Sequence, residues 1–332
     1  MTQRILLVKF GPIGDVVMAT PILEAAARLM TGSQVTWLTT ASLAPLIARL
    51  HPAPEIITVD DRALWHGNLW QRARLLINLR RQLAGRRFDL GLFAHANRRM
   101  QKMLWGLSVG AWRSFDIDAG LPRRGSRHHD EHVRLLTGAD QPTPSIAAYP
   151  TVELQPPTLE LPPHPRIALV PGGARNPLRE DALRRWPLAH YVALARLLSA
   201  RGINVILAGG PDDAWTQSAF TGVPVTNTIG KTSIVGALDL FAVCDAVVAH
   251  DSGPMHLADL AGVPVIALFG PTSPHEKGPI GKRAQIFWGG ESLTCRPCYD
   301  GVNYADCNRN LCLEEVTPEQ VLAAILAVQA NS

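Results

Sequence analysis

The fold is decided by the stretch Ala246-Val247-Val248-Ala249-His250-Asp251-Ser252-Gly253-Pro254-Met255-His256, which joins a short apolar run to the start of a helix. Ser252 and Gly253 suit a helix N-cap, and Pro254 falls in the first turn, where its missing N–H costs nothing. The first amides of a helix have no partner within it, so they bind phosphate well. The stretch therefore predicts a phosphate-binding loop at the carboxyl end of a strand.

The same strand-to-helix pattern repeats on both sides of this loop. Strand-like apolar runs alternate with helix-length amphipathic segments, which is typical of a parallel sheet covered by helices. The strands expected here are Arg166–Val170, Asn204–Leu207, Val225–Thr228, Ala246–Ala249 and Val265–Phe269, and the helices are Ala189–Arg201, Asp213–Phe220, Ser233–Val243, Met255–Ala261 and Pro318–Ala330. Ligands of open α/β sheets bind beyond the carboxyl ends of the strands, so the loops after the strands are the candidate sites.

The first half of the chain carries a second α/β pattern. Its expected strands are Ile5–Lys9, Gln34–Leu38, Glu55–Val59 and Asp89–Phe93, and its helices are Val16–Met30, Ser42–Leu50 and Leu69–Ala84. Eight prolines in residues 141–165 exclude a helix or a central strand there. We predict two Rossmann-like, doubly wound domains facing across a cleft: residues 1–150, a linker at 151–165, and residues 166–332, which end in a helix.

Composition agrees with a folded chain of two domains. Of the 332 residues, 47% are hydrophobic and 18% charged, and no apolar run reaches the roughly 20 residues that span a bilayer. We read the start of the chain as a strand and expect a cytoplasmic protein.

The two halves of the chain differ in charge. Residues 1–150 hold 19 Lys and Arg against 11 Asp and Glu, whereas the remainder holds 13 against 17. The basic half would attract an anionic partner, although solvated arginines are the alternative, and no aromatic-interleaved basic motif favours nucleic acid.

The first expected strand ends in Lys9-Phe10-Gly11-Pro12-Ile13-Gly14-Asp15. Gly11 and Gly14 allow a tight turn and close approach of a ligand to the backbone. Their G-x-x-G spacing does not match the dinucleotide fingerprint, so dehydrogenase chemistry has little support. Asp15 lies beside the expected cleft, and the alternative is a helix-start residue favoured by the dipole.

Three more loops follow strands in the second half. They contain Pro171-Gly172-Gly173, Gly209-Gly210-Pro211-Asp212 and Gly270-Pro271-Thr272. Arg184-Arg185 precede Trp186-Pro187, and an arginine there suits a diphosphate. Together with the loop at Asp251, these segments describe a pyrophosphate cradle with an acid for a ribose hydroxyl.

At these residues the sequence resembles a known family. Lys9–Pro21, Pro171–Pro187, His250–Leu257 and Gly270–Pro274 look like the motifs of glycosyltransferase family 9, the ADP-heptose:lipopolysaccharide heptosyltransferases, and they occur in the family's order along nearly the whole chain. The resemblance implies a GT-B fold and an inverting, metal-independent transfer of heptose from ADP-heptose to the lipopolysaccharide inner core, a lipid A-Kdo type acceptor. It also implies an enzyme peripheral to the inner membrane of a Gram-negative-type bacterium.

The resemblance assigns roles to individual residues. Asp15 matches the family's general base, and Arg184 stands where the family usually has a lysine. The donor-binding set is Gly172, Arg184, Asp212, Asp251, Ser252, Gly253, His256, Gly270 and Thr272, and the acceptor-binding set is Lys9, Gly11, Gly14, Arg98 and Arg99. The alternatives are another nucleotide sugar or acceptor, a nucleotide-sugar epimerase, and a non-catalytic nucleotide-binding or carbohydrate-binding module.

Four of the five cysteines form the pattern Cys295-x2-Cys298-x8-Cys307-x4-Cys312, whose spacing suits a structural zinc or iron site. Cysteine-rich inserts recur here in the resembled family, and some hold iron. Cys244 is expected as a buried thiol. The histidines at 128, 129 and 132 lack a completing ligand of recognised spacing, so we expect packing rather than a metal site. No cofactor is required by this reading.

Overall fold

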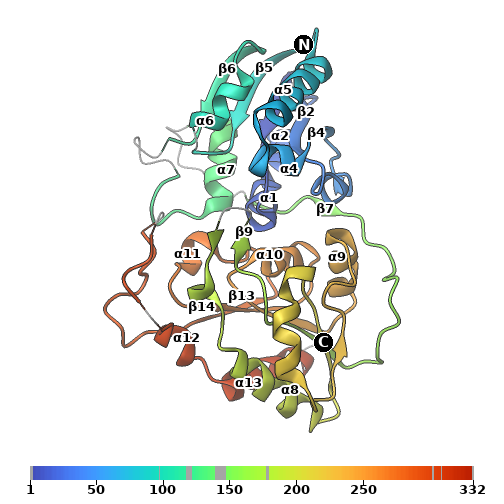
Figure 1. Cartoon of the computed structure of the whole chain (residues 1–332), viewed down its shortest axis with the longest axis vertical. Coiled ribbons are helices and arrows are strands. Elements are labelled where there is room, and N and C mark those ends of the chain that lie inside the picture. The colour runs from blue at the N-terminus through green and yellow to red at the C-terminus, as the bar shows by residue number, and fades with distance from the viewer. Residues whose placement is uncertain are drawn as a thin grey trace. The chain divides into compact units, whose positions relative to one another are not determined.

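The structure is a computed structural model that describes residues 3–96, 98–116, 122–138, 147–176, 179–300, 303–307 and 309–330. The chain divides into two compact units, Met1–Glu153 and Leu154–Ser332. Each unit has its own parallel sheet flanked by helices (Figure 1). No helix among the described residues is both long enough and apolar enough to cross a membrane.

The sheet of the first unit has the strand order β4-β2-β1-β5-β6, with every neighbouring pair parallel. Its strands are β1 (Arg4–Val8), β2 (Gln34–Thr40), β4 (Glu55–Val59), β5 (Arg87–Phe93) and β6 (Ser108–Ser114). Its helices are α1 (Ile13–Ala19), α2 (Pro21–Leu29), α3 (Ala44–Ile47), α4 (Asp61–His66), α5 (Leu69–Leu83), α6 (Arg98–Gln101), the 3-10 turn η1 (Lys102–Leu104) and α7 (His128–Thr137). The apolar run of β1 is buried on both faces, as a central parallel strand requires.

The sheet of the second unit has the order β12-β11-β8-β13-β14-β15, again all parallel. Its strands are β8 (Arg166–Val170), β11 (Asn204–Leu207), β12 (Thr226–Asn227), β13 (Ala246–His250), β14 (Val265–Phe269) and β15 (Ala284–Trp288); β9 (Arg175–Asn176) and β10 (Arg179–Glu180) form a small separate hairpin. Its helices are η2 (Ala182–Arg184, 3-10), α8 (Leu188–Ser199), η3 (Pro211–Phe220, 3-10), α9 (Ile234–Ala242), α10 (Gly253–Leu260), α11 (Pro274–Lys277), α12 (Leu311–Glu314) and α13 (Pro318–Ala330).

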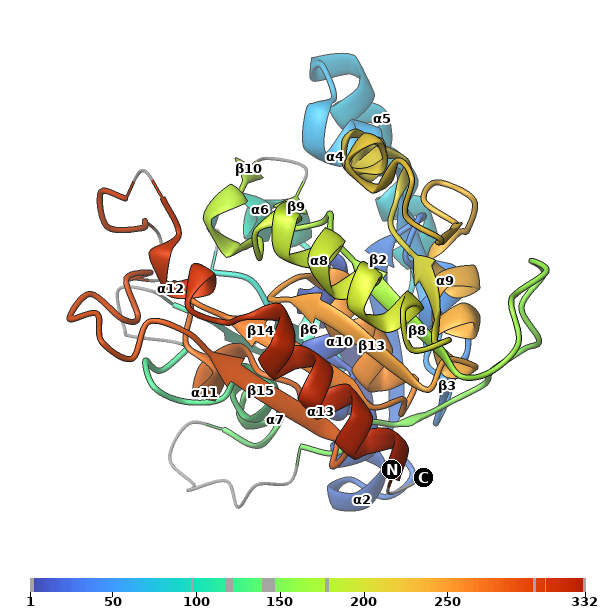
Figure 2. The ribbon, with the colours of Figure 1, turned by 90° about the horizontal axis from the view of Figure 1, so that it is seen from below.

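The core of the second unit lies between this sheet and two helices. In Figure 2, α8 and α13 lie side by side in front of the sheet, and α10 lies behind it. Alternate residues of each strand, such as Ile167 and Leu169 of β8, pack against Leu194 and Leu198 of α8 and Ile325 of α13. Counted in strand order, the arrangement is 3-2-1-4-5-6, which confirms the doubly wound fold expected from the sequence.

Several elements differ from the expectation. The helix predicted over Val16–Met30 is two helices, because Pro21 occupies the first turn of α2 and the Thr20 hydroxyl donates to the Val17 carbonyl. The segment predicted as an α-helix at Asp213–Phe220 is the 3-10 helix η3. The predicted helix Ser42–Leu50 shortens to α3. The strands β6 and β15 escaped prediction because both are half-exposed edge strands without a continuous apolar run.

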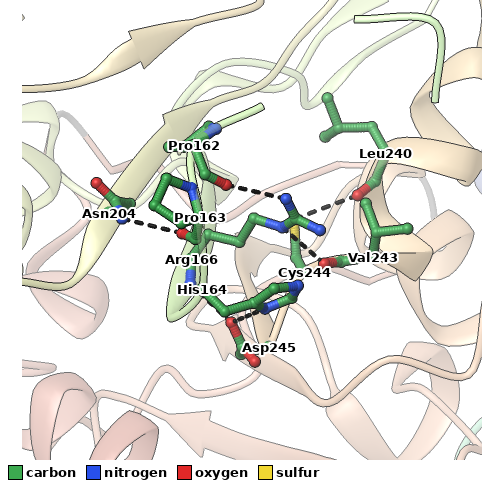
Figure 3. Close-up of polar contacts among 9 residues, drawn as sticks. All are labelled: Pro162, Pro163, His164, Arg166, Asn204, Leu240, Val243, Cys244 and Asp245. Carbon is green, nitrogen blue, oxygen red and sulfur yellow. Dashed lines mark hydrogen bonds and ion pairs between the residues drawn. The ribbon is translucent and has the colours of Figure 1, made fainter. Parts of the chain in front are cut away.

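The proline-rich segment is held at both ends. Thr151–Val152 forms β7, which pairs with β3 (Leu50–His51) of the first unit. Just before β8, polar contacts fix the chain to the second unit (Figure 3). Arg166 donates from Nε to the Val243 carbonyl (2.8 Å) and from its terminal nitrogen to the Pro162 carbonyl (2.9 Å). The carboxylate of Asp245 lies 2.6 Å from the Arg166 amide.

Candidate functional site

The strand orders locate one candidate site in each unit. In a doubly wound sheet, ligands bind where two neighbouring strands send their connections in opposite directions. This point lies between β1 and β5 in the first unit and between β8 and β13 in the second. The loops that follow these four strands contain most of the predicted site residues.

In the first unit, Lys9 and Asp15 form an ion pair directly after β1. The Lys9 ammonium lies 3.3 Å from the Asp15 carboxylate and donates to the Ala94 carbonyl, after β5, at 3.0 Å. The Lys9 side chain is 5% exposed, whereas that of Asp15 is 46% exposed. Lys9 therefore orients Asp15 from inside the protein, and the carboxylate itself stays accessible to a ligand.

The backbone geometry of this turn explains its glycines. Val16 donates to the Pro12 carbonyl, so α1 begins immediately and carries Asp15 in its first turn. A Cβ on Gly11 would lie 3.2 Å from Leu43, and Gly14 is buried within α1. The other predicted acceptor-binding residues, Arg98 and Arg99, begin α6, and their side chains lie outside the described part of the structure.

Two histidines near this pair were not predicted as site residues. The Phe10 amide donates to Nε2 of His95 at 2.9 Å, so the neutral ring carries its proton on Nδ1. Burial, and then the charge of Lys9, lower the pKa of His95 well below its ordinary value. Burial likewise lowers the pKa of His132 on α7 to about 3, with Lys9 as the next cause. Both rings are therefore neutral near pH 7. The only feature of the sequence that could have indicated a site residue here is the position of His95 directly after a predicted strand.

In the second unit, Arg184 joins two carboxylates. Its guanidinium lies 3.2 Å from Asp251 and 2.5 Å from Asp181, and Asp251 also accepts a hydrogen bond from the Thr272 hydroxyl at 2.7 Å. Burial alone would raise the pKa of Asp251, but Arg184, with Lys277 and Thr272, holds it below its usual range. The structure thus brings Arg184, Asp251 and Thr272 together, and it adds Asp181, which the sequence did not single out.

A second acid, Asp213, connects two glycine loops. Its carboxylate accepts from the Gly173 amide (2.7 Å) and from the Gly210 amide (2.8 Å). A Cβ on Gly172 would lie 2.3 Å from this carboxyl group, so the glycine is required there. The predicted donor residue Asp212 has a side chain that is 82% exposed and lies 4.0 Å from Arg175. Asp213 therefore shapes the loop, while Asp212 stays available to solvent.

The loop before α10 lies where the sequence predicts it, but the Ser252 side chain does not cap the helix. Ser252 is the N-cap residue, yet its hydroxyl donates to the His250 carbonyl (2.9 Å) and makes no capping hydrogen bond to the first turn. Ser252 also lies against the Gly172–Gly173 loop, since a Cβ on Gly173 would be 3.3 Å from its Cβ. The amides that begin at Gly253 are therefore left for a ligand. His256 is buried within α10.

Gly270 has a packing role. A Cβ there would lie 2.6 Å from the Cys312 sulfur and 2.7 Å from Leu313, because α12 packs against the loop. The four clustered cysteines are free thiols, and burial raises the pKa of Cys312 to about 11. Within the described residues, no three His, Cys, Asp or Glu side chains come together as a group that could hold a metal ion. The metal site at Cys295, Cys298, Cys307 and Cys312 therefore stays a prediction.

Comparison with known proteins gives consistent matches. Residues 147–307 match the model of glycosyltransferase family 9 (heptosyltransferase). Lipopolysaccharide heptosyltransferase 1 of Pseudomonas aeruginosa is 29% identical over 89% of this chain and 86% of its own length. Lipooligosaccharide heptosyltransferase 2 of Haemophilus influenzae is 38% identical, over 37% of this chain and only 36% of that relative.

Solved structures agree on the fold. The structure of the Escherichia coli ADP-heptose lipopolysaccharide heptosyltransferase II covers 99% of this chain and 100% of its own, with a TM-score of 0.70 and 21% identity. At that identity the likeness shows a shared GT-B fold. Combined with the family match and with relatives aligned along most of the sequence, it leads to one conclusion: the chain is similar to glycosyltransferase family 9 in sequence over residues 147–307 and in fold along its whole length.

Proposed function

We propose that the protein transfers heptose from ADP-heptose to the inner core of lipopolysaccharide, with inversion at the anomeric carbon. The observation that supports this most strongly is the half-exposed Asp15 carboxylate, oriented by buried Lys9 at the switch point of the first unit. The heptosyltransferase relative from Pseudomonas aeruginosa, aligned over 89% of the chain, supports the same reaction. The acceptor would be an anionic glycolipid, which suits the basic first half of the sequence.

The second unit would bind the donor. The first amides of α10 and the Gly172–Gly173 loop offer N–H groups to a diphosphate. Arg184 uses two terminal nitrogens on Asp181 and Asp251, and a guanidinium has further N–H donors for a phosphate oxygen. Charge on the leaving ADP would thus be stabilised by hydrogen-bond donors already held in place.

The reaction itself would be one displacement. The acceptor hydroxyl oxygen attacks the anomeric carbon as the bond to the diphosphate breaks, and Asp15 takes the hydroxyl proton. ADP leaves with the bonding electron pair, and the new glycosidic bond has inverted configuration. In this scheme the arginine and the amides supply the leaving-group stabilisation that a divalent cation supplies elsewhere, so we propose a metal-independent reaction at the cytoplasmic face of the inner membrane.

The test is ADP release from ADP-heptose by the purified protein, with and without heptose-free lipopolysaccharide. Asp15→Asn keeps the shape and an oxygen for Lys9 but accepts no proton, so turnover should fall by about 10² to 10⁴ while ADP affinity is unchanged. Asp89→Asn is the matched control, because its carboxylate is exposed and accepts the amide of Arg4 at the start of β1, so the change should leave turnover unaltered. Wild-type turnover should be unchanged in the presence of a chelator. Near-normal turnover of Asp15→Asn would disprove the assignment of Asp15 as the general base.

The same assay separates the alternatives. A panel of ADP-, UDP- and GDP-sugars identifies a transferase with another donor. Turnover of the nucleotide sugar without acceptor indicates an epimerase. Tight ADP binding without release from any sugar or acceptor indicates a non-catalytic binding module.

A further inference from the structure

The outer face of α5 is unusually apolar for a surface helix. One side of the helix is buried through Leu75, Leu79 and Leu83, which pack in the core of the first unit. The opposite side presents Trp70 (86% exposed) and Ile77 (53%), and Leu69 (85%) is the first residue of the helix. Trp70 and Ile77 fall on one sector of the helix because they are about two turns apart, and Leu69 lies at the flank of that sector. An apolar stripe on the solvent side has no role in folding the unit.

A second tryptophan lies beside this stripe. Trp105, which is 85% exposed, follows η1, and its carbonyl accepts a hydrogen bond from Arg80 of α5. Arg80 also lies 3.0 Å from where a Cβ on Gly106 would be. The side chains of Leu69, Trp70 and Trp105 are the three most exposed large apolar side chains in the described part of the chain. We call Leu69, Trp70, Ile77 and Trp105 the tryptophan patch.

Basic residues border one side of the tryptophan patch. The sequence of α5 holds Arg72, Arg74, Arg80 and Arg81 and has no Asp or Glu, and Lys102 lies in η1. On a helical projection, Arg81 and Arg74 follow directly after Trp70, at the border of the apolar sector. An apolar centre with a basic border and no acid is the pattern of a helix that lies in the surface of an anionic bilayer.

We propose that the tryptophan patch and the arginines around it bind the surface of a bilayer that contains anionic lipid. Tryptophan prefers the membrane–water interface, and each Lys or Arg near an anionic surface adds attraction to it. A second copy of the chain fits this face less well, because a two-fold contact would set arginines against arginines. The proposal stands on α5 and Trp105 alone and does not rest on the proposed reaction, although a lipid-borne acceptor agrees with it.

The test is flotation of the full chain with vesicles, which needs no substrate. Wild type should float with vesicles of phosphatidylethanolamine and phosphatidylglycerol, weakly with phosphatidylcholine vesicles, and less at high salt. Trp70→Ala/Trp105→Ala should abolish flotation. Arg74→Glu/Arg81→Glu should weaken binding to the anionic vesicles by at least about 30-fold, since each lost cation removes roughly a factor of five.

Matched controls come from the second unit. Trp215→Ala removes a tryptophan that is 48% exposed, and Arg196→Glu/Arg201→Glu reverses two exposed cations; both should float like wild type. Unchanged thermal unfolding of the patch variants shows that they fold. The proposal is overturned if wild type ignores anionic vesicles, or if both patch variants bind like wild type. It is also overturned if wild type is a dimer that Trp70→Ala/Trp105→Ala dissociates, because the patch is then a subunit interface.

Discussion

Replacing Asp213 by asparagine should both destabilise the second unit and weaken ADP binding. Asp213 is 9% exposed, and its carboxylate accepts hydrogen bonds from two amides, that of Gly173 on one oxygen and that of Gly210 on the other. Asparagine keeps one oxygen, but its NH₂ group faces the second amide, so one acceptor is replaced by a donor. A hydrogen bond to a charged group contributes about 1.5–3 kcal/mol, so the free energy of unfolding should fall by about 2–3 kcal/mol.

The neighbouring Asp212 supplies the control for this experiment. Its side chain is 82% exposed and lies 4.0 Å from Arg175, so Asp212→Asn should change stability by less than about 0.5 kcal/mol. Urea unfolding measures the stability of both variants, and titration calorimetry measures their affinity for ADP. We expect weaker ADP binding for Asp213→Asn because the Gly172–Gly173 loop loses its anchor. Equal stability of Asp213→Asn and wild type would refute the structural role, whatever the affinity.

Three further perturbations separate roles in the two units. Lys9→Met should lower the turnover number by more than about tenfold at unchanged KM for the donor, because Asp15 loses its orienting cation; steady-state kinetics decide this. Gly270→Ala should cost about 1–3 kcal/mol through contact with Cys312 and Leu313, and Cys312→Ala should restore part of the thermal stability by removing the first of these contacts. Loss of ADP binding that persists in that double variant would instead assign the glycine to the donor. The depressed pKa of His132, about 3, means that only the unfolded chain takes up its proton, so the stability from this residue is full above about pH 6.5 and falls below it by up to about 1.4 kcal/mol per unit. His132→Asn should flatten that slope in urea titrations across this range, and an unchanged slope would contradict the assignment.

The sequence predicted the central strands of both sheets well because burial on both faces leaves continuous apolar runs. The central strands β8, β11 and β14 have the bounds expected from the sequence pattern, and so does the edge strand β4, which keeps an apolar pair at Ile56 and Ile57. The edge strands β6 and β15 leave no continuous apolar run, since one side of each contacts solvent, and their pattern resembles a loop. The 3-10 character of η3 also has no apolar signature. It depends on Asp213, whose side chain bonds back to the backbone at Gly210.

The candidate site was predictable only where a motif lies within one loop. Gly172, Asp251 and Thr272 stand directly after strands, and the topology brings the first two together at the switch point. The neighbour relation between the loops at Phe10 and His95 joins residues 85 positions apart, so no local pattern indicates it. Asp212 and Asp213 look alike in the sequence. Only the folded loop shows which carboxylate is buried and which is exposed.

At both switch points the described cations are paired with carboxylates, but the two arrangements differ. At the first, one ammonium faces one carboxylate, so the pair is neutral, and its carboxylate half is 46% exposed. At the second, Arg184 faces two carboxylates, and Arg185 is paired with Glu180 at 2.7 Å. Arg184 and Arg185 are thus already paired with carboxylates before a donor binds. In the donor site proposed above, the charge of a diphosphate would therefore be compensated largely by oriented amides, those of the Gly172–Gly173 loop and of the first turn of α10. We therefore expect the shape of the loop, set by Asp213, to matter to donor binding as much as the arginine does.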